Sequence, residues 1–109
     1  MNYLDAAAQQ IKDELATDLW PAKRREDLFR LYGLLMLVKG VRCTLEDVHD
    51  AWSTWMVVEH PDHDALVPFC DLSRDVQEED RPYLEAIQRA AESSRPRVEL
   101  PAEGQGRRA

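Results

Sequence analysis

The sequence predicts a small all-α domain: one compact bundle of about four main helices, with a short helical turn and an extended crossing segment. Apolar residues recur at spacings of three and four along most of the chain, which is the period of an α-helix, and strand-like alternation is lacking. The length of 109 residues suits a single domain. The periodic pattern fills residues 2–94, whereas residues 95–109 contain two prolines and two glycines without a period, which predicts a mobile tail.

The first two helices follow from apolar stripes and helix-ending residues. In residues 3–16 the apolar positions keep the spacing of one buried stripe. Pro21 suits a first helical turn, and Gly40 after Lys39 is a common way to end a helix, so the second helix is expected between them. We expect this helix to be the central one, with a face made of Leu28, Leu31, Leu35 and Val38 and with Phe29, Tyr32 and Met36 beside it.

A third helix begins after Thr44, which is a strong N-cap residue, and Asp47 favours the positive end of the helix dipole. Its apolar positions again form one face: Val48, Trp52, Trp55 and Met56. His49 lies three residues before Trp52, so the two rings are helical neighbours.

The region after the third helix is expected to cross the base of the bundle before the chain becomes helical again. Pro68 biases the residue before it away from helix. Ser73 or Asp71 is expected to cap a short turn, and Asp80 to cap the last helix. We expect the crossing segment, residues 66–72, to bury Leu66, Val67, Phe69 and Leu72 against Trp52 and Leu31.

The charge is uneven and mostly acidic. The chain has a net charge of −7, and residues 43–94 hold thirteen Asp/Glu against three Arg. Such a surface repels a phosphate backbone, so nucleic acid is not an expected partner. No apolar run is long enough to span a bilayer, and the first residues lack a secretory pattern. We therefore expect a cytoplasmic protein, in the host if it is encoded by a phage, with Cys43 and Cys70 as reduced thiols.

Two stretches, "DVHDAW" and "ALVPFCDLSRDVQEEDRPYLEAIQRA", are similar to the RyR domain, the helical repeat named after ryanodine receptors. The shared features are a His-x-x-Trp step at His49 and Trp52, an apolar-apolar-Pro-aromatic segment at 66–69, then Leu72 and Asp80. They cover residues 47–91. The whole chain also resembles small uncharacterised proteins of actinobacteria and their phages, through "YLD", "DLFRLYGLLMLVKG" and "EDVHDAWSTWM".

The resemblance implies a helical module without a known catalytic reaction, and a role in binding nucleotide-type ligands. In that hypothesis the protein senses or sequesters a nucleotide-derived signal, the aromatic groups hold the base and two arginines meet the phosphate. The expected ligand-binding residues are His49, Trp52, Trp55, Pro68, Phe69, Arg74 and Arg81.

Each of these residues also has a purely structural interpretation. Tryptophans at helical spacing are typical of a core, and a hydrogen bond from His49 to the backbone of residues 66–69 would satisfy a buried imidazole. His60 and His63 do not predict a metal site, because Cys43 and Cys70 stand alone rather than in a close pair. Neither a catalytic motif nor a cofactor-binding motif is present, so we expect a protein that is not an enzyme and has no cofactor.

A second hypothesis is an acidic protein-interaction or inhibitory module. In that case the surface of residues 59–80 meets a basic protein partner, and the acids that carry the contact are Asp62, Asp64, Glu78 and Glu79. A concave aromatic pocket with an arginine at its rim would favour the ligand hypothesis, whereas a flat acidic face with Trp55 exposed would favour the protein partner.

Overall fold

The computed structural model describes residues 2–94 and confirms the all-α class, with no strand in that range. The predicted tail, residues 95–109, lies outside the described residues. The α-helices are α1 (Tyr3–Asp13), α2 (Arg25–Val38), α3 (Leu45–Met56), the short α4 (Arg74–Glu78) and α5 (Arg81–Ser94). Three 3₁₀ turns join them: η1 (Thr17–Leu19), η2 (Gly40–Arg42) and η3 (Phe69–Asp71).

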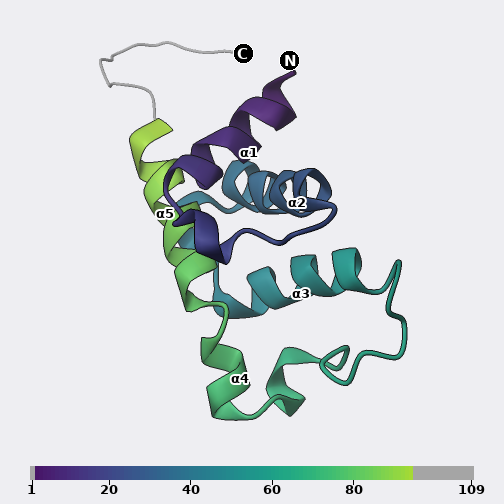
Figure 1. Cartoon of the computed structure of the whole chain (residues 1–109). Helices are drawn as coiled ribbons and strands as arrows, with labels where there is room; N and C mark the ends of the chain where they lie inside the picture. Colours follow the sequence, from purple (N-terminus) through teal and green to yellow (C-terminus); the bar gives the residue numbers. More distant parts are fainter. Residues whose placement is uncertain (1, 95–109) are drawn as a thin grey trace.

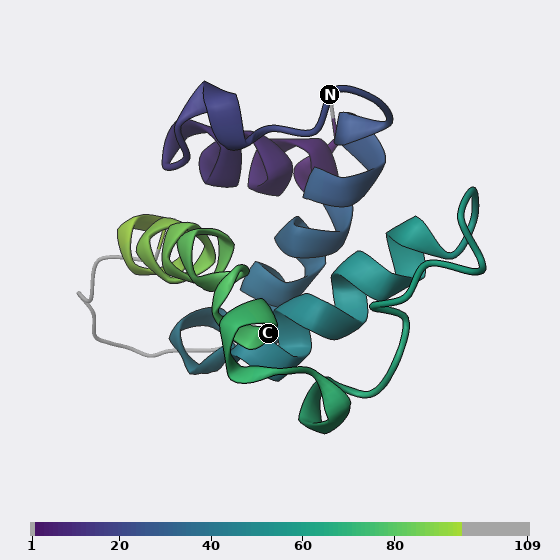
Figure 2. The ribbon, with the colours of Figure 1, turned by 60° about the horizontal axis from the view of Figure 1, so that its bottom comes forward.

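Helix α2 is central, as predicted. It packs between α1 and α3, and α5 runs beside all three of these helices (Figure 1). Residues 57–73 leave the end of α3, turn back beneath it and return to α4, which is plain when the molecule is turned (Figure 2). The core therefore lies where α1, α2 and α5 meet the first half of α3.

Local signals place most helix ends. Asn2 caps α1 by accepting a hydrogen bond from the N–H of Asp5 at 2.8 Å. Thr44 and Asp47 form a capping box at the start of α3, with each side chain accepting from the other residue's backbone N–H. Ser73, rather than Asp71, caps α4. Gly40 has a φ of 58°, a conformation that glycine adopts without the strain imposed by a Cβ.

The predicted start of α2 is wrong. The helix begins at Arg25 rather than at Pro21, because Arg24 has a left-handed backbone, with a φ of 52°, and interrupts the helical path. Helix α1 likewise ends at Asp13, earlier than the predicted residue 16.

The predicted buried stripe of α2 also needs correction. Val38 is 66% exposed, and Leu31 and Leu35 are only half-buried. The deepest face is instead made of Leu28, Phe29, Tyr32, Gly33 and Met36. Because α2 is apolar on nearly every side, periodicity alone could not decide which side the other helices cover.

The crossing segment is less buried than predicted. Val67 is 38% exposed, and Leu66, Phe69 and Leu72 are half-buried outside the main core. The physical reason is its position: the segment runs along α3, on the far side of this helix from α1, and so covers the edge of the bundle rather than its base (Figure 1). Leu31 faces a different part of the surface.

Candidate functional site

His49 ties α3 to the crossing segment. Its side chain is 3% exposed, and its Nε2 lies 2.7 Å from the backbone oxygen of Val67. A bond of this length to a carbonyl requires that Nε2 carry the proton and donate it. The hydrogen bond from His49 to the backbone of residues 66–69, which the sequence analysis gave as its structural interpretation, is therefore present, and through it the imidazole holds the crossing segment against α3.

Trp52 stands at the edge of the same contact. Its ring stacks on His49, with centroids 5.8 Å apart and planes 22° apart, and meets the ring of His63 edge-on at 5.1 Å. Trp52 is half-buried and lies outside the main core, so one part of its indole remains accessible. The expectation that its side chain is core is therefore only partly met.

Three of the predicted site residues do share one recess. Phe69, Arg74 and Arg81 line a hollow of about 620 Å³ between the start of α3, α4 and the start of α5. Pro68 is exposed and is not part of its lining. Arg81 is held by Glu78 through two hydrogen bonds of 3.0 and 2.9 Å.

Charge in this recess is balanced. The two arginines face Glu78 and Glu46, which also line it. Pairing with Arg81 lowers the pKa of Glu78, so this carboxylate is ionised at neutral pH. An anion entering the recess must therefore compete with Glu78 for Arg81. Of the two arginines that line the recess, Arg74 forms no ion pair with any described residue.

Trp55 belongs to a different part of the surface. Its indole N–H donates to the backbone oxygen of Arg24 at 3.0 Å, and Nη1 of Arg24 donates to the backbone oxygen of Trp55 at the same distance. The guanidinium also lies over the indole ring, 5.1 Å from its centroid. This reciprocal contact accounts for the left-handed backbone at Arg24, since the loop must turn there to reach the end of α3.

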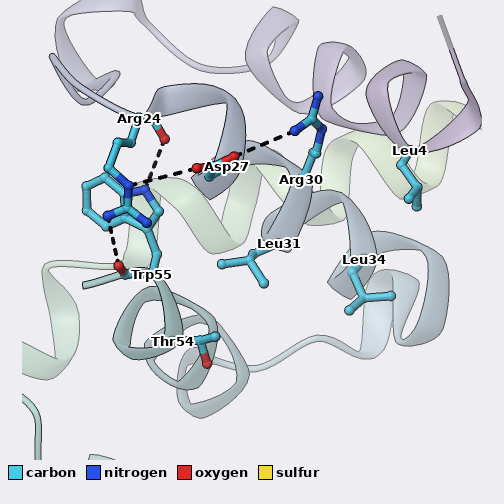
Figure 3. Close-up of a pocket in the computed structure, with 8 residues that line it drawn as sticks. All are labelled: Leu4, Arg24, Asp27, Arg30, Leu31, Leu34, Thr54 and Trp55. Carbon is cyan, nitrogen blue, oxygen red and sulfur yellow. Dashed lines mark hydrogen bonds and ion pairs between the residues drawn. The ribbon is translucent and has the colours of Figure 1, made fainter. Parts of the chain in front are cut away.

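Beside this contact lies an apolar groove between α1, α2 and α3, with a volume of about 320 Å³ (Figure 3). Leu31 and Leu34 of α2 form its centre, with Leu4 at one end and the Arg24–Trp55 contact at the other. The complete lining is Leu4, Arg24, Asp27, Arg30, Leu31, Leu34, Thr54 and Trp55.

The polar rim of the groove is already paired. Nε of Arg30 donates to Asp5 at 2.7 Å, and its Nη1 lies 3.6 Å from Asp27. This pairing lowers the pKa of Asp5, chiefly through the hydrogen bond from Arg30. The groove thus offers apolar side chains at its centre and satisfied charges at its border.

The groove is the feature that sequence reasoning missed. Leu34 is 48% exposed, and Leu37 and Val38 follow it on the outer face of α2. A signal was present in "LFRLYGLLMLV", which holds more apolar residues than one buried stripe of a helix needs. An amphipathic helix has a polar outer face, and the absence of one along this stretch indicates a second contact surface.

The described residues contain no group of three or more His, Cys, Asp or Glu side chains that could hold a metal ion. Both cysteines are free. Burial raises the pKa of the Cys43 thiol to about 11, so this thiol is protonated at neutral pH and is a poor nucleophile. No helix within residues 2–94 has the length and apolar character needed to cross a membrane.

Comparison with known proteins corrects the family assignment. Residues 2–92 match a domain of unknown function, DUF7701, and no match to the RyR domain is found. The predicted RyR resemblance is therefore wrong, because a His-x-x-Trp step and a Pro-aromatic turn are short enough to recur in unrelated helical domains. No curated protein and no solved structure matches the chain. Since the match covers nearly all the described residues, the chain belongs to the DUF7701 family.

Proposed function

We propose that this protein is a non-enzymatic interaction module that binds another protein surface through the groove between α1, α2 and α3. The observation that carries the proposal is the exposed apolar centre of this groove, where Leu34 is 48% exposed beside the half-buried Leu31. The partner is thus a protein, as in the second hypothesis from the sequence, but the proposed contact lies on this apolar groove rather than on the acidic surface of residues 59–80.

A partner that covers this groove would remove its apolar side chains from water. A single exposed leucine is ordinary, but exposed apolar groups that adjoin a concave surface indicate an interaction site. Each exposed apolar side chain that a partner covers contributes favourably, in proportion to the area removed from water. A helix laid into a groove uses this arrangement, with a few apolar anchors and a polar border. Here the ion pairs of Arg30 and Arg24 would form that border.

The test compares Leu34→Glu with Val58→Glu in capture experiments from a lysate of cells that naturally contain the protein. Both residues are exposed and apolar, at 48% and 68%, but only Leu34 lines the groove. Thermal unfolding first verifies that each variant folds. We expect a partner bound by the wild type and by Val58→Glu to be lost with Leu34→Glu, by at least about ten-fold. A partner retained equally by both variants would contradict a role for the groove.

A second candidate function is binding of a small anionic ligand of the nucleotide type. The observation that favours it is the recess shared by Phe69, Arg74 and Arg81, whose volume suits a small molecule. Phe69 would contact a planar base, and Arg74 is the free cation for a phosphate. The balanced charge of the recess makes this the weaker of the two candidates.

This candidate is tested by thermal shift against nucleotides and cyclic nucleotides. A ligand present at 100 times its dissociation constant adds about 2.7 kcal/mol to the free energy of unfolding. The double variant Arg74→Gln, Arg81→Gln should abolish that shift. Gln replacement of Arg30, which lies on the groove, is the matched control and should leave it intact. A shift that survives the double variant would exclude the recess.

A further inference from the structure

The groove contains a carboxylate that a bound partner must cover. Asp27 lines the groove beside Arg24, and Leu31 and Leu34 follow it along α2 (Figure 3). The spacings of four and three residues place Asp27 and the two leucines on one face of the helix. This face is about 10 Å long, at 1.5 Å per residue. A partner that reaches both leucines therefore also reaches Asp27.

The carboxylate of Asp27 has ion-pair partners but accepts no hydrogen bond from any described residue. Its oxygens lie 3.8 Å from Nε of Arg24 and 3.6 Å from Nη1 of Arg30, which is too far for a hydrogen bond. Each arginine has a closer contact elsewhere. Arg30 donates to Asp5 at 2.7 Å, and Arg24 donates to the backbone oxygen of Trp55 at 3.0 Å. The side chain of Asp27 is 56% exposed, so solvent satisfies it in the free protein.

The charges around the groove are unequal in number. Glu59 lies 3.9 Å from Nε of Arg24, and its side chain is 52% exposed. The ion pairs thus join the three carboxylates of Asp5, Asp27 and Glu59 to two guanidiniums, which leaves one negative charge in excess. The chain as a whole has a net charge of −7, which adds to this negative field.

We propose that the partner of the groove is a basic amphipathic helix, whose apolar side chains cover Leu31 and Leu34 and whose lysine or arginine meets Asp27. This inference rests on the proposed function and names the chemistry of the partner. A carboxylate that is covered without a hydrogen-bond donor is unfavourable, so an apolar or acidic surface would leave Asp27 unsatisfied. A cation one helical turn from the apolar anchors removes this penalty and adds a charge-assisted hydrogen bond.

The experiment measures the binding of two synthetic peptides to the full chain by fluorescence anisotropy. Both are designed helices of about 15 residues with leucines along one face. One peptide carries lysines at its other positions, and the second carries glutamates there. We expect the lysine peptide to bind at least about ten-fold more tightly, with an affinity that falls as salt is raised. Equal affinities, the reverse order, or no binding of the lysine peptide would overturn the inference.

Matched variants separate the groove from the general attraction of an acidic protein for a basic peptide. Asp27→Asn with Glu59→Gln removes two charges at the groove, and Asp75→Asn with Glu79→Gln removes two exposed charges at α4. Thermal unfolding first verifies that each variant folds. The groove pair should weaken binding of the lysine peptide by about five-fold or more, and the α4 pair by less than about two-fold. Equal losses would mean that net charge alone attracts the peptide, and the inference would fail.

A neutral substitution tests the apolar anchor without changing the charge. Leu34→Gln should weaken binding of the lysine peptide by at least about ten-fold, whereas Val58→Gln, outside the groove, should leave it unchanged. Binding that is insensitive to Leu34→Gln would place the peptide elsewhere and overturn the inference.

The outcomes also separate the inference from the proposed function. If neither peptide binds, but a natural partner is captured in a Leu34-dependent manner, the basic helix is wrong and the groove is upheld. If both peptides bind equally and both lose affinity with Leu34→Gln, the apolar groove is again upheld and the basic partner is wrong. If substitution of Leu34 has no effect in either assay, both the inference and the proposed function fail.

Discussion

Replacing Asp80 by asparagine is expected to stabilise the protein at neutral pH, against the usual effect of changing a residue at a helix start. Asp80 precedes α5 and its backbone oxygen accepts the N–H of Leu84, but its carboxylate forms no hydrogen bond or ion pair with any described residue. The predicted side-chain cap at this position is therefore wrong. Burial raises the pKa of the carboxyl to about 6, against the opposing effect of His49 and with a further increase from Glu79.

The effect of Asp80 on the free energy of unfolding follows from the difference between its pKa in the folded and in the unfolded protein. The unfolded pKa is 3.8 and the folded pKa about 6, so the ionised carboxylate costs at most about 3 kcal/mol, at 1.36 kcal/mol per unit. Asp80 is only partly buried, and solvent screening reduces this cost to about 1 kcal/mol. Between pH 4 and pH 6 the folded state holds more protons than the unfolded state. Stability from this group is therefore present at low pH and is lost as pH rises toward about 6.

The assay is urea unfolding of the wild type and Asp80→Asn at several pH values between about 4 and 7.5, a range that brackets the expected titration. We expect the variant to be more stable at pH 7 by about 1 kcal/mol, and the difference to shrink as pH falls. Asp62→Asn, at an exposed loop position, is the matched control and should show no such difference. A variant that is less stable than the wild type at pH 7, or a difference independent of pH, would refute the reasoning.

Three further changes probe the packing. Gly33→Ala should lower the free energy of unfolding by about 1–2 kcal/mol in urea unfolding, because the added Cβ would lie 3.2 Å from the Cβ of Ala7 and from the backbone nitrogen of Ala8. This crowding outweighs the higher helix propensity of alanine. Equal or greater stability would show that α1 can move aside. Trp52 is half-buried, so Trp52→Ala should lower the free energy of unfolding by about 2 kcal/mol in the same assay, less than the 3–5 kcal/mol expected of a fully buried ring. A loss of about 3 kcal/mol or more would place Trp52 in the core. Lys12 is 9% exposed, its Nζ lies 2.6 Å from Glu26, and it faces two aromatic rings. Glu26→Gln leaves this buried charge without its partner, whereas Lys12→Met removes the charge, so Glu26→Gln should lower the melting temperature more. The reverse order would mean that the ion pair contributes net stability.

The sequence by itself determined the helical class and most helix boundaries. Caps are local: Thr44 and Asp47 are three residues apart, and Gly40 needs only its own freedom of φ, so both could be recognised without tertiary contacts. The same is true of the step from His49 to Trp52, which helical spacing brings together and which the structure shows as stacked rings. Binding by the seven predicted site residues stays a prediction.

Only the tertiary structure decided which faces are covered. Arg24 has its left-handed conformation where it contacts Trp55, 31 residues away in the sequence. The residues next to Arg24 do not indicate such a distant contact. Lys12 meets Glu26 across two helices in the same way. Helix α2 is apolar on both faces, so the choice of buried side depended on where α1, α3 and α5 pack, and this choice left Leu34 at the surface. An α-helix forms through hydrogen bonds between residues four apart in the sequence, so local patterns can predict it. The groove depends on how three helices pack together, which local patterns do not determine.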